Sequence, residues 1–217
     1  AIEIDPGFVQ AYWALGLAHG GLGNDAEYRA AALEALKRSS AQPEQVRRLT
    51  EILVSDADFE FERELELLHA YTRVHPYDWR MRIALSNLYM WILEDFATAE
   101  THRRAAYEIL PYGNLPALSA ALAAQGKSPE IERLVAEHKV RGGSAEEIGT
   151  ALEYAAVALE SPAAGWSAID RNDKEYRPAN EDVAVDRLFV LLAAGRLAEA
   201  RHQATTLWQE ASRNKNR

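Results

Sequence analysis

The sequence predicts an all-α protein built as a solenoid of antiparallel helix pairs. Apolar residues recur at helical spacing, as in Leu85, Leu88, Tyr89 and Ile92, and no comparable stretch alternates with a period of two. Proline residues lie where one helical pattern ends and the next begins, at Pro6, Pro43, Pro76, Pro111, Pro129, Pro162 and Pro178. The low content of 12 Gly and 8 Pro also favours helices.

The first predicted helix, near residues 7–22, ends in a stretch with three glycines, Gly20, Gly21 and Gly23. A phosphate-binding loop would need a strand before it, but the preceding residues are helix-periodic, and no Gly-Lys-Ser/Thr follows. We therefore expect Gly16 to let a second helix approach closely and Gly23 to end the helix in a left-handed cap. Asn24 or Asp25 is expected to cap the next helix.

The remaining helices follow from the same alternation of apolar periodicity and helix-ending residues. They are expected near residues 25–38, 43–56, 59–74, 78–93, 95–110, 115–125, 128–141, 145–160, 162–172, 179–194 and 197–213. Together with the first, these helices would form six antiparallel pairs in one array over residues 1–217. The clearest pairs are 6–40, 43–76, 79–111 and 179–213, and residues 114–175 are degenerate.

The pairs repeat at about 35 residues, a period that is typical of helical solenoids. "AAALEALKRSS", "ELELLHAYTRVHPYD" and "AETHRRAAYEILPYG" align at this spacing, and Pro76 and Pro111 lie one unit apart. Each unit of such an array buries its apolar face only against its neighbours.

The motif residues resemble those of the tetratricopeptide repeat (TPR) family. They are Tyr12, Leu15, Gly16, His19, Gly23, Ala35 and Leu36 in the first unit, Leu85, Tyr89, Ala99, Ala106 and Pro111 in the third, and Leu188, Gly195 and Ala200 in the last. The chain departs from the family pattern at Tyr28, Ser40 and Arg103 and has one extra residue near Glu94. In addition, residues 47–78 resemble the linking unit of repeat arrays in bacterial multidomain signalling proteins, in which such arrays are C-terminal.

This resemblance implies a right-handed superhelix whose first helices line a concave groove. The implied groove residues are Trp13, Leu17, Arg80, Ile83, Asn87, Met90, Asp182, Val185 and Phe189. The alternative is that several of them are core or capping residues. The implied function is a non-catalytic scaffold that binds a protein or peptide. A self-associating module, such as a homodimer, and a small-ligand sensor are the other hypotheses.

Composition restricts the other classes of function. A net charge of −9 and a pI near 5.2 disfavour binding to nucleic acid or anionic lipid. The chain has no cysteine, which excludes disulfides and thiolate chemistry and leaves both cytoplasm and periplasm open. It has no apolar run of membrane-spanning length. It opens with "AIEIDPG" and no Met, as expected of a fragment that begins at the end of a helix in a longer protein.

No residue pattern predicts an enzyme, a metal or a cofactor. Glu66 and His69 share one helical face, and Glu199 and His202 have the same spacing, but a di-iron bundle also needs a further inward-facing Glu from each of two other helices, so we predict no metal site. His102 and His138 lie beside basic residues and are expected on solvated surfaces. No nucleophile motif occurs.

The acidic stretch at 55–66 permits two interpretations. Its acids fall into two rows with a spacing of four residues, Asp56, Glu60 and Glu64 in one row and Asp58, Glu62 and Glu66 in the other. Rows of like charge cost a helix a few tenths of a kcal/mol per pair. The stretch is either a solvated outer face or a docking surface for a basic partner.

Overall fold

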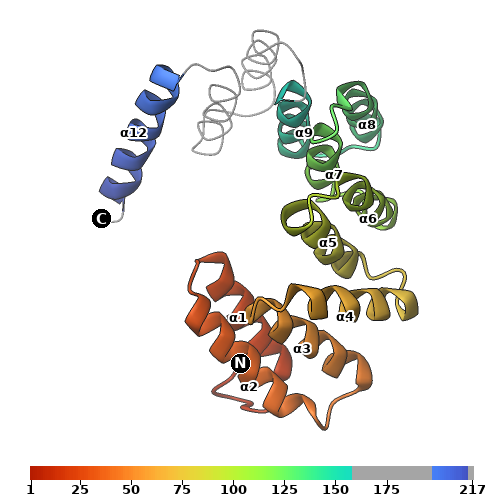
Figure 1. Ribbon diagram of the computed structural model, residues 1–217, viewed down its shortest axis with the longest axis vertical. Coiled ribbons are helices and arrows are strands. Elements are labelled where there is room, and N and C mark those ends of the chain that lie inside the picture. Colours follow the sequence, from red (N-terminus) through yellow and green to blue (C-terminus); the bar gives the residue numbers. More distant parts are fainter. Residues whose placement is uncertain (158–196, 215–217) are drawn as a thin grey trace. The chain divides into compact units, whose positions relative to one another are not determined.

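The structure is a computed structural model that describes residues 1–157 and 197–214. Every regular element within these ranges is a helix (Figure 1). The all-α prediction is therefore confirmed for the described part of the chain. The chain divides into two compact units, residues 1–88 (unit 1) and residues 89–217 (unit 2). The single solenoid over residues 1–217 stays a prediction.

Unit 1 consists of consecutive helices, each of which packs against the next one in the sequence (Figure 1). They are α1 (Val9–Gly21), α2 (Asp25–Ser39), α3 (Glu44–Ala57), α4 (Phe61–Val74) and α5 (Trp79–Asn87). Sequential packing of this kind is expected where short turns join antiparallel helices.

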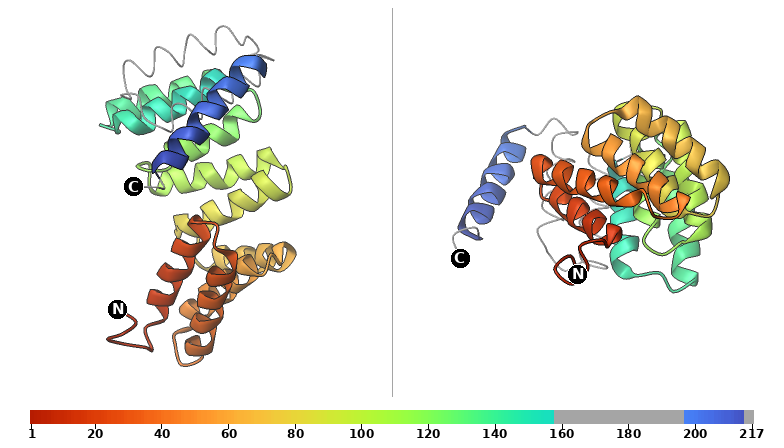
Figure 2. Two further views of the ribbon diagram at one scale, coloured as in Figure 1. Left: turned by 90° about the vertical axis from the view of Figure 1, so that its left-hand side faces the viewer. Right: turned by 90° about the horizontal axis from the view of Figure 1, so that it is seen from below.

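In unit 2, α7 is the central helix of the described part, because it packs against α6, α8 and α9. The helices are α6 (Phe96–Ile109), α7 (Leu115–Ala123), α8 (Ser128–Val140) and α9 (Ala145–Val157), followed after the undescribed stretch by α12 (Leu197–Asn214). Figure 2 shows the first four of these as stacked layers. Contact of α7 with both α8 and α9 places alternate helices side by side, as in stacked helix pairs.

The predicted helix bounds agree closely with those of the structure, and the expected helices 162–172 and 179–194 lie outside the described residues. The predicted helix 78–93 is not α-helical over its whole length. It continues past α5 as a π-helical turn, η1 (Leu88–Ile92), and Glu94 then adopts a left-handed backbone with φ 54°. A π-turn holds one residue more than an α-turn. The turn lies just before Glu94, where the predicted repeat alignment has one extra residue.

Two glycines do what the sequence predicted of them. Gly23 has a φ of 70°, in the left-handed region. A Cβ added to Gly16 would lie 3.2 Å from the ring of Tyr28, so the glycine lets α2 pack closely on α1. Tyr28, which departs from the family pattern, fills the space that the glycine leaves. Asn24 does precede α2 as its N-cap residue, but its side chain makes no capping hydrogen bond.

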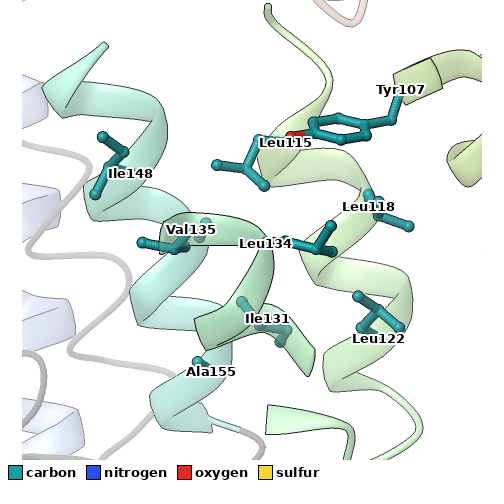
Figure 3. Close-up of a cluster of buried hydrophobic side chains, with 10 residues drawn as sticks. Tyr107, Leu115, Leu118, Leu122, Ile131, Leu134, Val135, Ile148 and Ala155 are labelled. Carbon is teal, nitrogen blue, oxygen red and sulfur yellow. The ribbon is translucent and has the colours of Figure 1, made fainter. Parts of the chain in front are cut away.

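The core of unit 2 forms around α7 (Figure 3). Leu115, Leu118 and Leu122 repeat at helical spacing and are fully buried. They pack with Ile131, Leu134 and Val135 of α8, with Ile148, Ala151 and Ala155 of α9, and with Tyr107 of α6. Because α7 is apolar on almost every side, it needs neighbours on every side.

Candidate functional site

Helix α1 is the most unusual surface element of unit 1, because it contains no Asp, Glu, Lys or Arg. Its sequence is VQAYWALGLAHGG, and apolar or small residues surround the helix axis. A helix of this composition is normally covered on all sides. In this chain only one side of α1 is buried.

The covered side of α1 faces α2 and α3. Val9 and Tyr12 are buried, and the guanidinium of Arg38 lies over the Tyr12 ring, 4.5 Å from its centroid. The indole Nε1–H of Trp13 donates a hydrogen bond of 3.0 Å to the hydroxyl oxygen of Thr50 in α3. These contacts fix the rotation of α1 about its own axis.

The opposite side of α1 is exposed and mostly apolar, and Gln10 is its one polar side chain. Leu17 has 61% of its surface exposed and Leu15 has 41%, while Ala14 and Ala18 are also exposed. At 100° per residue, these four side chains span about 160° of the helix circumference. Leu22, immediately after the helix, extends the same side. We call Ala14, Leu15, Leu17, Ala18 and Leu22 the α1 face.

The two predicted groove residues of α1, Trp13 and Leu17, differ in their exposure. Leu17 is exposed on the α1 face. Trp13 is only half-exposed, and its polar atom is already bonded to Thr50. It therefore serves in part as a packing residue between α1 and α3, which is the alternative that the sequence left open.

The groove residues predicted for the central repeat lie on α5 and on the π-helical turn η1 that follows it. Arg80 and Asn87 are exposed, and Ile83 is half-buried. Met90 is the exception, because only 5% of its surface is exposed and it packs with Ala99 in the core of unit 2. The prediction that Met90 faces a partner is therefore wrong. Asp182, Val185 and Phe189 lie outside the described residues.

The acidic stretch at 55–66 is only partly a solvated surface. Glu64 is buried, the hydroxyl of Tyr28 donates a hydrogen bond to Oδ2 of Asp56, and Asp58 forms an ion pair with Arg29. The Arg29–Asp58 pair borders an open hollow of about 450 Å³ at the start of α2, which Phe59 also lines. Asp56 and Asp58 thus form bonds within unit 1 and Glu64 is buried there, a result that neither interpretation of the stretch predicted.

Burial and neighbouring charge change the pKa values in this acidic cluster. Burial, and secondly the nearby Asp56 carboxylate, raises the pKa of Glu64 to about 8. Burial, followed by the hydrogen bond to Asp56, also raises the pKa of Tyr28, so its phenol stays protonated. Tyr28 can therefore act only as a hydrogen-bond donor to Asp56.

A second polar cluster surrounds His138 in unit 2. His138 is fully buried, so the prediction that it lies on a solvated surface is wrong. Its Nε2 lies 3.2 Å from Oε2 of Glu147, and its Nδ1 lies 3.4 Å from the Tyr107 hydroxyl. His102 is buried too, and its ring stacks on that of Tyr89. In both cases the tertiary packing buries the side chain, although its neighbours in the sequence are basic.

Glu147 joins the helices of this second cluster. The amide N–H groups of Gly113 and Ser144 donate hydrogen bonds to its carboxylate, as does the Ser144 hydroxyl. Burial alone would raise the pKa of Glu147, but these hydrogen bonds and that of His138 together lower it. His138 has no solvent-accessible surface, so this arrangement resembles a structural joint more than a reaction centre.

The described residues contain no group of three or more His, Asp or Glu side chains placed to hold a metal ion. No described helix combines the length and the apolar character needed to cross a membrane. A scan against protein-family models and a search of curated proteins each found no match for the chain.

Proposed function

We propose that this chain is a non-catalytic protein-interaction module of the tetratricopeptide type, and that it binds its partner through the α1 face. The observation that carries this proposal is the exposed, uncharged side of α1. A monomeric soluble protein seldom leaves one side of an apolar helix uncovered, and such patches commonly mark binding surfaces. The rigid attachment of α1 to α2 and α3 supports the proposal, because a preformed surface reduces the ordering cost of binding.

The proposed partner element is an apolar side of a helix or an extended apolar segment. The exposed alanines, Ala14 and Ala18, allow close approach, and Leu15 and Leu17 supply apolar area on either side of them. Arg80 and Asn87 of α5 are exposed in the same unit, and in the proposed superhelix they would add polar contacts.

Replacement of Leu17 by glutamate tests the α1 face. Leu17→Glu should weaken partner binding at least tenfold, or about 1.4 kcal/mol, because it places a charge in an apolar contact. Val74→Glu is the matched control, since Val74 is an equally exposed aliphatic residue on α4. Both full-length variants and the parent chain would serve as baits in lysate of the source organism.

A protein that the parent chain and Val74→Glu retain, and that folded Leu17→Glu loses, would support the proposal and provide the partner. Equal retention by all three baits would overturn it. Circular dichroism checks that each variant keeps its helix content.

Self-association is the second candidate, and it also rests on the α1 face. A chain with a net charge of −9 repels its own copies, except where the contact surface carries no charge. The α1 face is such a surface. Sedimentation velocity of the parent chain over a range of concentrations should then show a dimer that Leu17→Glu abolishes. A monomer at every concentration would exclude this candidate.

A further inference from the structure

Glu64 is a buried acid with an unsatisfied oxygen. It lies in the first turn of α4, and only 4% of its surface is exposed. Its Oε2 atom is buried and has no hydrogen-bond partner among the residues that the structure describes. An ionised carboxylate in this position would lose its hydration without gaining a compensating bond.

The groups that face Glu64 from the neighbouring helices offer no positive charge. Asp56 of α3 is the nearest acid, and Tyr28 of α2 uses its hydroxyl to bond Asp56. No ion pair within the described residues includes Glu64. Two basic residues of α2 and α4 pair with other acids: Arg29 with Asp58, and Arg63 with Glu60.

Two effects oppose each other at Glu64. The N-terminal turn of α4 favours a negative charge through the helix dipole. Burial and the Asp56 carboxylate disfavour it and dominate, which raises the pKa of Glu64 to about 8. The neutral acid is therefore the form that fits this position at neutral pH.

We propose that Glu64 is a proton-controlled joint of unit 1, at which loss of the proton loosens the packing of α4 against α3. The joint extends to α1. The ring of Tyr28 packs on Gly16 and Gly20 of α1, while its hydroxyl bonds Asp56 beside Glu64. A charge on Glu64 thus acts on a chain of contacts that runs through all four helices. The joint does not depend on the binding role proposed for the α1 face.

The sign of the pH effect follows from proton linkage. The folded chain holds a proton on Glu64 up to about pH 8, whereas the unfolded chain releases it near pH 4.5. The stabilisation is complete below pH 4.5 and is lost as the pH rises through 8. For one such group the unfolding equilibrium constant should rise roughly 50-fold between pH 6 and pH 8.

Carbon-13 NMR of the Glu64 carboxyl group in the full chain tests the proposal directly, with Glu64→Gln used to assign the signal. The expected result is a titration with a midpoint near pH 8. A signal that is already in its ionised position at pH 6 would overturn the proposal. This measurement uses the unmodified chain, so it decides the question even if the variant folds poorly.

Urea unfolding at pH 6 and pH 8 provides the second test. The parent chain and Glu66→Gln, an exposed control on the same helix, should both become less stable at pH 8 by the same factor. The unfolding equilibrium constant of Glu64→Gln should not show the roughly 50-fold rise between pH 6 and pH 8, because its side chain is neutral at both pH values. An identical loss in Glu64→Gln would show that other groups cause the pH dependence and would refute the joint.

Discussion

Replacement of Gly143 by alanine adds only one methyl group, yet we expect it to destabilise unit 2 strongly. A Cβ on Gly143 would lie 1.9 Å from Cδ2, 2.2 Å from Nε2 and 2.7 Å from Cγ of His138. These distances are far inside van der Waals contact, so the imidazole would have to move. The ring is fully buried and has no free space to enter.

The magnitude follows from the contacts that this movement breaks. Overpacking a core typically costs about 1–3 kcal/mol. Separating His138 from Glu147 and Tyr107, which lie 3.2 Å and 3.4 Å from its ring nitrogens, leaves buried polar atoms unsatisfied and adds about 1–3 kcal/mol. We therefore expect the free energy of unfolding to fall by about 2–6 kcal/mol.

Urea unfolding of the full chain, followed by circular dichroism, measures this change. Gly142→Ala is the matched control, because its Cβ would enter open space and cost only about 1–2 kcal/mol through its φ of 79°. In a double-mutant cycle, His138→Ala should remove most of the Gly143→Ala penalty. A Gly143→Ala penalty no larger than that of Gly142→Ala, or one that persists without the imidazole, would refute the reasoning.

Three further predictions concern the two units separately. Leu118→Ala should lower the free energy of unfolding by about 2–5 kcal/mol in a urea titration, because Leu118 is fully buried in the α7 core; a cost below 1 kcal/mol would contradict this packing. Tyr28→Phe should cost about 1–3 kcal/mol, since it removes a hydrogen-bond donor from the half-buried Asp56 side chain, and an unchanged unfolding midpoint would argue against that bond. Glu147, whose pKa is lowered in the fold, should stabilise unit 2 fully above its ordinary pKa of 4.5 and lose this contribution as the pH falls. Glu147→Gln should therefore unfold with a weaker dependence on acid pH, and an unchanged acid titration would contradict the assignment.

Local sequence patterns predicted the helices because helix periodicity and helix-ending residues act over a few residues. The glycine of the first helix was predictable for the same reason: Gly16 sits on the side of α1 that carries Tyr12 and Val9. The left-handed turn at Gly23 needs no tertiary information either. These features depend only on the local backbone conformation and the adjacent turn, which can both be predicted from neighbouring residues in the sequence.

Burial of single side chains was less predictable, because it depends on which helices meet. Met90 and Leu17 both lie on apolar helices, yet one enters a core and the other remains exposed. Glu64 appeared to continue a charged surface, but it is buried where α4 packs on α3 and where its charge acts on Asp56 and Tyr28. For His138 one local signal existed: a second glycine, Gly143, follows the helix-ending Gly142, and the close approach of the imidazole requires it.

The π-helical turn at Leu88–Ile92 has a consequence for how the predicted repeats should be aligned. One additional residue advances every later side chain by about 100° around a helix axis. An alignment without a gap across this turn would therefore pair outward positions of one repeat with inward positions of the next. The predicted repeats should therefore be aligned with a one-residue insertion at the end of the predicted helix 78–93.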